Sequence, residues 1–262
     1  DTSANCTLVG QPLTEEKVFH TLTASDYTEI TFETTDTVTT ITRNSQTSSG
    51  GFVTFNQQFN TTSDSDKLTT LRFKFDYGGD TTQWIGFGQP GTDLTDIPGL
   101  WDKSQAFVNS IDFALVRKPT YIAICKTNDG TVEPEQKIIE GGQVYNEDYQ
   151  SWMLPEDEYV TDPLSESQLD EYTFEIRFTV SKVEYYKINN TTQVETKIHT
   201  TEHTITNALC AKAHIYNSTG SISNIRMSTI TTQNASDYNF GKSVAITDKW
   251  AIVGDEGNQK AF

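Results

Sequence analysis

The sequence lacks several features that would assign it to a class of protein at once. No run of 18 apolar residues occurs, so no membrane-spanning helix is predicted. Basic residues are scarce: 19 lysines and arginines stand against 36 aspartates and glutamates, for a net charge of −17. Nucleic-acid binding requires a basic stripe on the surface. We therefore expect no nucleic-acid partner and interpret the acidic surface as solvated.

Metal-ligand patterns are also missing. The three cysteines, Cys6, Cys125 and Cys210, form no Cys-x-x-Cys motif. In an oxidising compartment one pair of them should close, and the sequence leaves all three pairings open. His199 and His203 share a strand face but lie about 13 Å apart at ~3.3 Å per residue, too far to chelate one ion. We predict no metal and no cofactor.

The start of the chain and its sequons indicate secretion. The sequence begins at Asp1 instead of Met, as expected for a secreted protein whose leader has been removed. Most of the Asn-x-Ser/Thr sequons fall in predicted turns, where a glycan fits. The predicted glycosylation sites are Asn5, Asn60, Asn189, Asn190, Asn217 and Asn234. Adjacent Asn189 and Asn190 compete sterically, so we expect full occupancy at only one. The expected location is extracellular, secreted or at the cell surface.

Hydrophobic periodicity predicts an all-β fold. In residues 172–180, apolar Phe174, Ile176, Phe178 and Val180 alternate with polar residues, which places them on one face of a strand. Similar patterns predict further strands near residues 28–34, 37–42, 51–55, 71–77, 83–88, 110–116, 120–125, 183–188, 194–198, 209–216 and 222–227. The only helix candidate, residues 13–20, is short. A hairpin with a Gly-rich loop is predicted to join 71–77 to 83–88.

These patterns divide the chain into three parts. Residues 1–21 form an N-terminal arm, residues 22–231 a two-sheet sandwich, and residues 232–262 a linker with a β-hairpin. Within the sandwich, residues 89–109 are the longest irregular stretch, and loops of that length are usually functional or interfacial. Residues 132–170 are acidic and are predicted to be loop-like.

The sandwich region resembles concanavalin A-like lectin/glucanase domains, the jelly rolls that include laminin-G-like modules. The resemblance is carried by residues 174–178, by residues 183–186 with Asn189, and by residues 222–226. Residues 110–115 match the family's "s-I-D-y-a-i" segment. The resemblance implies two packed sheets and says little about activity, because such folds host unrelated functions.

The C-terminal part resembles a single FG-GAP repeat, the unit of integrin-type β-propellers. Matching positions include Phe240, Gly241, Ser243, Val244 and Ile252, whereas Asp255 stands where that family has Ala. A propeller needs several blades. A lone unit cannot close on itself, so we expect these strands to pack elsewhere.

Catalytic motifs are not found. Glucanase relatives carry paired carboxylates on one strand, since glycoside hydrolysis needs two carboxyl groups about 5–10 Å apart. Here Glu156, Asp157 and Glu158 follow a proline in a polar loop, and their carboxylates should spread into water. We predict that the protein is not an enzyme.

A lectin site is the alternative that the aromatic residues suggest. Trp84, Phe87, Trp101, Tyr145, Tyr149 and Trp152 could line a sugar platform, or could instead seal loops onto the sandwich edge. The predicted glycan contacts are Trp101, Trp152, Asp96 and Asp102.

The function predicted first is structural. We expect a glycosylated, non-catalytic subunit of a self-assembling surface filament or coat, whose partners are copies of itself. A lone hairpin is at best marginally stable, and its open edges invite pairing. The residues assigned to assembly are Cys6, Phe240, Val244, Ile246, Trp250 and Ile252. The alternative is a glycan-binding lectin-like module of an adhesin, with extracellular glycans as partners, and a glycoside hydrolase is third.

Overall fold

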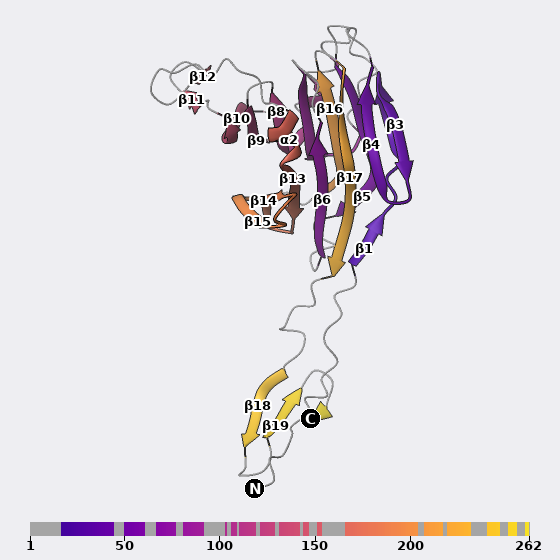
Figure 1. Ribbon diagram of the computed structural model, residues 1–262. Helices are drawn as coiled ribbons and strands as arrows, with labels where there is room; N and C mark the ends of the chain where they lie inside the picture. Colours follow the sequence, from indigo (N-terminus) through magenta and orange to yellow (C-terminus); the bar gives the residue numbers. More distant parts are fainter. Residues whose placement is uncertain are drawn as a thin grey trace.

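A computed structural model shows the chain as two large antiparallel sheets (Figure 1). The structure describes residues 17–44, 50–60, 67–76, 81–91, 103, 106–108, 110–118, 121–128, 131–141, 144–146, 151–153, 166–203, 207–216, 219–231, 240–246, 251–255 and 260–261. Among these residues, no helix is long and apolar enough to cross a membrane.

Sheet A has the strand order β15-β14-β13-β6-β17-β4-β3, with β1 also paired to β17. Its strands are β1 (Lys17–His20), β3 (Thr31–Thr35), β4 (Val38–Arg43), β6 (Lys67–Phe75), β13 (Tyr172–Phe178), β14 (Lys182–Asn189), β15 (Glu195–Glu202) and β17 (Gly220–Thr231). Sheet B has the order β10-β9-β8-β7-β16-β5-β2. Its strands are β2 (Ala24–Thr28), β5 (Gly51–Asn60), β7 (Thr82–Gly88), β8 (Ile111–Lys118), β9 (Tyr121–Asn128), β10 (Thr131–Gly141) and β16 (Ala208–Tyr216).

Two strands late in the sequence occupy central positions in the two sheets. Strand β16 lies between β5 and β7 in sheet B, and β17 lies between β4 and β6 in sheet A. Near the end of β17, Nε2 of His20 and Oγ1 of Thr229 are hydrogen-bonded at 3.0 Å, which joins β1 to this late strand. The interior of each sheet is therefore completed by the last part of the sandwich.

The core lies between the sheets and is rich in phenylalanine. Phe178 of sheet A lies 5.7 Å from Phe87 and 5.6 Å from Phe113 of sheet B, measured between ring centroids. All three side chains are buried, and aromatic contacts at tilted or edge-on angles are favourable. The alternation seen in the sequence thus places one face of each sheet in a shared core.

The predicted all-β two-sheet sandwich is confirmed, and so are the strands of its closing half. Strands β13, β14 and β15 form the expected antiparallel series. The predicted hairpin between residues 71–77 and 83–88 is wrong, because β6 belongs to sheet A and β7 to sheet B. The connection crosses between the sheets, and alternation along each strand cannot distinguish a crossing from a tight turn.

Two further corrections concern segments with weak patterns. Residues 17–20, within the predicted arm and the short helix candidate, form strand β1. The stretch predicted to be loop-like contains β10, the antiparallel pair β11 (Val144–Asn146) and β12 (Ser151–Met153), and the five-residue helix α2 (Glu166–Asp170). Acidic strands at a sheet edge do not show the apolar alternation that identifies a half-buried strand.

The C-terminal strands form a small sheet of their own. Strands β18 (Phe240–Ile246), β19 (Ala251–Asp255) and β20 (Lys260–Ala261) pair in that order. The predicted hairpin is therefore present as β18 and β19. Among the described residues, none of these strands is hydrogen-bonded into sheet A or sheet B.

Candidate functional site

The outer face of sheet B carries aromatic and charged side chains on adjacent strands. Trp84 of β7 lies directly opposite His214 of β16, and the next positions in this row are Phe52 of β5 and Val116 of β8. His214 is buried, whereas Trp84 is half-buried and remains accessible from solvent. We call this row and the adjoining residues Lys212 and Tyr216 the Trp84 face.

A short segment, described at residues 106–108 and 110, packs over part of the Trp84 face. The ring of Phe107 stacks on Phe52 at a centroid distance of 4.6 Å and lies 6.4 Å from the His214 ring. Nζ of Lys212 lies 5.3 Å from the centroid of the Phe107 ring and donates a 2.7 Å hydrogen bond to Oγ of Ser110. Ser110 in turn donates to the carbonyl oxygen of Phe107 at 2.6 Å. The segment is thus fixed by one aromatic stack and one chain of hydrogen bonds.

Burial changes the acid–base properties of this face. Burial lowers the pKa of His214 to about 3, and the positive charge of Arg43 adds to the effect. It also lowers the pKa of Lys212, against the opposing influence of Cys210 and Asp112. Burial raises the pKa of the Cys210 thiol to about 11, so this cysteine is protonated at neutral pH. The imidazole of His214 is therefore neutral and acts as a fixed polar group.

Two glycines of β7 allow the neighbouring backbone to approach. A Cβ atom on Gly86 would lie 1.9 Å from the carbonyl oxygen of Phe113, and one on Gly88 would lie 2.0 Å from that of Ser110. No side chain fits at either position without moving the backbone. The motif Trp84-Ile-Gly-Phe-Gly88 therefore presents a single large side chain, that of Trp84, on the outer side of β7.

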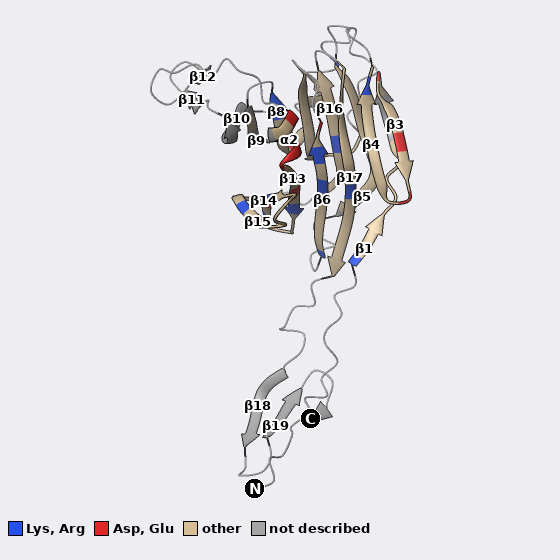
Figure 2. Ribbon diagram, in the orientation of Figure 1, with Lys and Arg blue, Asp and Glu red and all other residues tan. Residues whose placement is uncertain are grey.

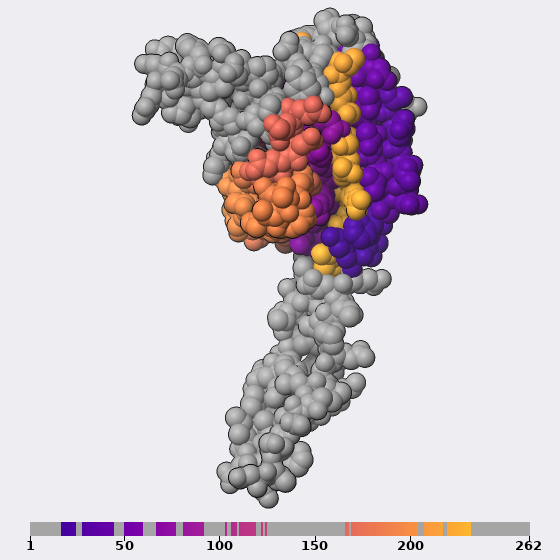
Figure 3. Space-filling model, viewed as in Figure 1, coloured from indigo at the N-terminus to yellow at the C-terminus, as the bar shows by residue number. Residues whose placement is uncertain are grey.

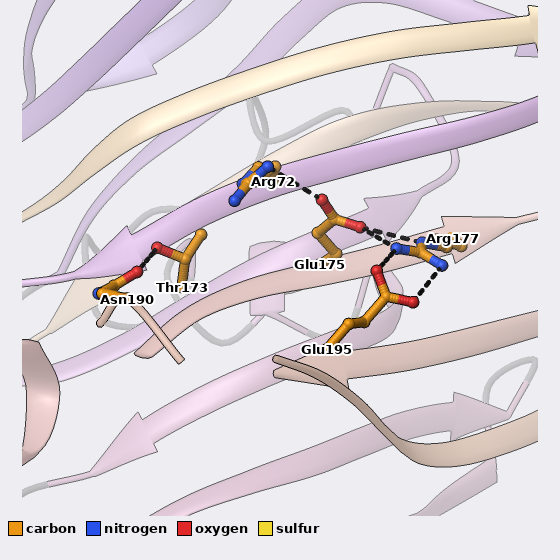
Figure 4. Close-up of polar contacts among 6 residues, drawn as sticks. All are labelled: Arg72, Thr173, Glu175, Arg177, Asn190 and Glu195. Atoms are coloured by element: carbon orange, nitrogen blue, oxygen red, sulfur yellow. Dashed lines mark hydrogen bonds and ion pairs between the residues drawn. The ribbon is translucent and has the colours of Figure 1, made fainter. Parts of the chain in front are cut away.

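The outer face of sheet A carries a different arrangement, a cross-strand network of ion pairs (Figure 4). Oε2 of Glu175 accepts hydrogen bonds from Nε and Nη2 of Arg177 at 2.9 and 2.6 Å. Arg177 also binds the carboxylate of Glu195, with Nη1 to Oε1 at 2.9 Å. Its guanidinium lies 3.8 Å above the centre of the Tyr186 ring. The second oxygen of Glu175 lies 3.6 Å from Nη1 of Arg72.

Glu184 is the centre of a second group on the same face. Burial alone would raise its pKa, but hydrogen bonds from Lys182, Lys197 and Tyr186 outweigh burial and lower it. Both lysines bind Oε1, at 3.0 and 3.3 Å, while the Tyr186 hydroxyl donates to Oε2 at 3.1 Å. A carboxylate held in this way stays ionised and is unsuited to donate a proton to a leaving group.

The predicted glycan contacts are not brought together within the described residues. Asp96, Trp101 and Asp102 lie outside them, while the backbone of Trp152 lies in β12, opposite Tyr145. Of the other aromatic candidates, Phe87 is wrong as a platform residue, because its side chain is buried in the core. Trp84 is the candidate that the structure places on an outer face.

The predicted cysteine and assembly residues are only partly described. Cys210 is a free, buried thiol that donates to the carbonyl oxygen of Gly88 at 3.6 Å. Its backbone is three strands away from that of Cys125 in sheet B, about 14 Å at the usual strand spacing, so these two cysteines cannot pair. Cys6 and Trp250 lie outside the described residues. The remaining assembly residues, Phe240, Val244, Ile246 and Ile252, have backbone positions in β18 and β19.

Two of the predicted glycosylation sites have described side chains. Asn190 donates from Nδ2 to the carbonyl oxygen of Asp170 at 2.7 Å. Its Oδ1 accepts from Oγ1 of Thr173 at 2.7 Å, the contact drawn in Figure 4. Oδ1 of Asn189 accepts from two backbone amides of its own turn, and its Nδ2 donates to Oε1 of Glu171 at 3.1 Å. Asn60 ends strand β5, and the side chains of Asn5, Asn60, Asn217 and Asn234 lie outside the described set.

Sequence reasoning missed the polar members of the Trp84 face. Lys212 and His214 alternate with Ala211, Ala213 and Ile215, a pattern typical of a strand with one solvated face. Their burial depends on residues 106–108 and 110, which lie around the end of the predicted irregular stretch, far away in the sequence. A charged residue between small apolar residues on a strand is only a weak indication of a functional site. The burial of Lys212 and His214 follows from the packing of the covering segment, which the sequence pattern does not show.

Comparison with solved structures finds lectin-like sandwiches. A legume lectin-like domain from Entamoeba histolytica is 11% identical, over 78% of this chain and 88% of that one, with a TM-score of 0.45. Arcelin-5, a lectin-like defense protein from Phaseolus vulgaris, is 8% identical over 83% and 98%, also with a TM-score of 0.45. Lectin II from Ulex europaeus is 9% identical over 82% and 97%, with a TM-score of 0.43.

These values describe a distant likeness of sandwich architecture and identify no ligand for this chain. The sandwich agrees with the concanavalin A-like resemblance of the sequence. No protein-family model and no curated protein sequence matches the chain. The resemblance of residues 239–254 to an FG-GAP repeat consequently rests on the sequence pattern alone.

Proposed function

We propose that this protein is a non-catalytic, glycan-binding module of lectin-like type, and that its site lies on the Trp84 face. The observation that carries the proposal is the position of a half-buried indole beside buried polar groups on the outer side of a sheet. A sugar ring offers an apolar face for stacking and hydroxyl groups for hydrogen bonds. The accessible part of the Trp84 ring can stack on that apolar face, while the buried Lys212 and His214 hold the surrounding surface in place.

The rigidity of this face supports the proposal. Lys212 and His214 are held by β16 below and by Phe107 and Ser110 above, so binding would not have to order them. A site that is ordered before binding loses less conformational entropy when the ligand arrives. Tyr216, whose ring lies 6.1 Å from that of His214, extends the aromatic surface along the strand.

The non-catalytic part of the proposal rests on the carboxylates. On the outer face of sheet A, Glu175, Glu184 and Glu195 are each bound to arginine or lysine. A glycosidase of the common type needs one carboxyl group with a raised pKa as the acid. The pKa of Glu184 is shifted in the opposite direction.

The test is a glycan array followed by calorimetry with the sugars that bind. Trp84→Ala should abolish binding, and Trp84→Phe should retain part of it because a smaller aromatic plane remains. Trp101→Ala and Trp152→Ala serve as matched tryptophan controls for the loop site predicted from the sequence. If Trp101→Ala or Trp152→Ala abolishes glycan binding while Trp84→Ala retains it, the site lies in the loops. No sugar bound at all would overturn the proposal.

We propose self-assembly as a second function, because β1 presents an open apolar edge within the described residues. Val18 and Phe19 are 45% and 47% exposed, and among the described strands β1 pairs only with β17. Edge strands with exposed apolar residues readily accept a further strand. A glycosylated extracellular subunit could join copies through this edge or through residues 232–262. Deletion of 232–262 should leave circular dichroism unchanged and shorten the particles seen by negative stain, whereas normal particles would rule out that segment as the connector.

A further inference from the structure

A pair of arginines stands at the centre of the outer face of sheet A. Arg226 of β17 lies directly opposite Arg72 of β6. Figure 2 shows the basic residues of β6 and β17 close together in the middle of the sheet, in a chain with a net charge of −17. Like charges directly opposite each other on neighbouring strands are destabilising. Something other than the stability of the sheet should therefore favour this pair.

A β-bulge sets the position of Arg226. Between the pairs Ser223–Lys74 and Arg226–Arg72, two residues of β17 face the single residue Phe73 of β6. The first of the two, Asn224, has a φ of 52°, a left-handed conformation that asparagine tolerates better than most residues. Bulges re-aim side chains and are frequent beside functional sites. The extra residue keeps Ile222 and Ile225 in the core and turns Arg226 outward beside Arg72.

The two arginines differ in how far carboxylate groups neutralise their charges. Nη1 of Arg72 lies 3.6 Å from Glu175, whose carboxylate is already bound twice by Arg177. Within the described part of the chain, the guanidinium of Arg226 makes neither a hydrogen bond nor an ion pair. Arg226 is exposed, and the atoms of β17 lie at the surface of the face seen in Figure 3. The pair therefore presents unneutralised positive charge to solvent.

The chemistry of the surroundings narrows the class of ligand. The nearest positions on the same face are Thr70, Ser223 and Ser228, together with Lys74, which is paired with Asp170. Protein partners usually bury apolar or aromatic anchors, and these neighbours are hydroxyl and charged groups. Strand β17 is paired on both sides, so it offers no backbone groups to an added peptide strand. A polyhydroxylated ligand that carries anionic groups fits this face better than a peptide.

We propose that Arg72 and Arg226 bind the sulfate or carboxylate groups of an acidic glycan. Two adjacent guanidinium groups can each form paired hydrogen bonds with such an anion. The overall negative charge of the chain opposes long-range attraction of a polyanion, so binding depends on contact at this pair and weakens as salt rises. The Trp84 face lies on the opposite sheet, and this second site is independent of it.

The experiment measures binding of four probes to the full chain by calorimetry: dextran sulfate, polygalacturonate, neutral dextran and polyglutamate. We expect one or both acidic polysaccharides to bind at low salt. Arg226→Gln and Arg72→Gln should each weaken binding about tenfold or more, while Arg226→Lys should weaken it less. Lys17→Gln, which removes one positive charge from β1, should leave the affinity unchanged.

A second measurement locates the site if a variant folds poorly. Amide chemical shifts of the wild-type protein, recorded during titration with the bound polysaccharide, should move in β6 and β17. The proposal is overturned if neither acidic polysaccharide binds or if Arg226→Gln binds like the wild type. It is also overturned if polyglutamate binds as well as the polysaccharides, which would indicate an acidic peptide. The glycan array with Trp84→Ala tests the neutral-glycan proposal separately, so either proposal can fail while the other stands.

Discussion

Nζ of Lys212 and Oγ of Ser110 form a 2.7 Å hydrogen bond that joins the middle of sheet B to the segment above it, across 102 positions of sequence. Ser110→Ala removes the acceptor and should lower the free energy of unfolding by about 1–3 kcal/mol, because a buried charged donor loses one partner. Urea denaturation measures the change. Thr31→Ala, which removes an exposed hydroxyl bonded to the carbonyl oxygen of Thr42, is the control and should cost clearly less. Equal costs would mean that the Lys212–Ser110 bond does not stabilise this face.

His214 should make the protein sensitive to mild acid. Burial, aided by the charge of Arg43, lowers its pKa in the folded chain to about 3 from 6.5. The folded state excludes the proton that the unfolded state binds, so the stabilisation is complete above pH 6.5 and is lost as the pH falls towards 3. Each pH unit in this window should remove about 1.4 kcal/mol.

Urea unfolding between about pH 5 and 6.5, where most carboxylates remain ionised, isolates this contribution. His214→Phe keeps an aromatic ring against Phe107 and should flatten the pH dependence. His20→Gln is the matched control, because burial and Lys67 also lower the pKa of His20 but the residue is only partly buried. A pH dependence that is as steep in His214→Phe as in the wild type would contradict the prediction.

Gly86 should not tolerate any side chain. A Cβ there would lie 1.9 Å from the carbonyl oxygen of Phe113 and 2.7 Å from Cα of Ala114, so Gly86→Ala forces β7 away from β8. We expect a loss of more than about 3 kcal/mol, in the range of overpacked cores, or failure to fold. Gly91→Ala is the comparison: its φ is 75° but the space around it is open, so the cost should be about 1 kcal/mol. Similar thermal stability of the two variants would show that the strands separate easily.

The adjacent sequons should differ in occupancy. The side-chain amide of Asn190 holds the end of α2 through Asp170 and accepts from Thr173, so a glycan on this nitrogen would break the attachment. Among the described residues, Nδ2 of Asn189 binds only the exposed side chain of Glu171, which can move away. After secretion from a eukaryotic host, glycopeptide mass spectrometry should find the glycan on Asn189. Asn189→Gln should then leave the Asn190 sequon sparsely occupied, and full occupancy there would refute the assignment.

The sequence was sufficient to predict the strands whose apolar residues alternate cleanly. Phe174, Ile176 and Phe178 face the core as their spacing indicated, because shifting the strand by one residue would turn all three into solvent. Val180, predicted on the same face, is 43% exposed because β13 ends at Phe178. It could not predict which sheet each strand joins. Strand β6 and strand β7 are consecutive and equally regular, yet they lie in different sheets, and only the packing of the whole chain decides this.

The burial of charged residues could not be predicted from the sequence either. Arg43 and Arg117 are both fully buried at core-facing positions, where the pattern alone would predict apolar residues. Arg43 binds Oε2 of Glu29 at 3.0 Å, and Arg117 donates to the carbonyl oxygen of Thr81 at 2.6 Å. These partners lie 14 and 36 positions away in sequence, on loops or strand ends whose approach is a tertiary property. The same reason explains why Trp84 was one candidate among six aromatic residues until the sheet placed it beside His214.

The central positions of β16 and β17 have a consequence for how the protein is made. A ribosome releases β4, β5, β6 and β7 long before residues 208–231, so each sheet exists at first as two halves with open edges. Contacts between distant parts of a sequence form slowly, and exposed strand edges aggregate while they wait. Folding of both sheets should therefore wait until residues 208–231 have left the ribosome. Truncation before residue 208 should yield a chain that associates with chaperones, whereas a circular permutant that begins at β16 could form both sheet centres early in synthesis.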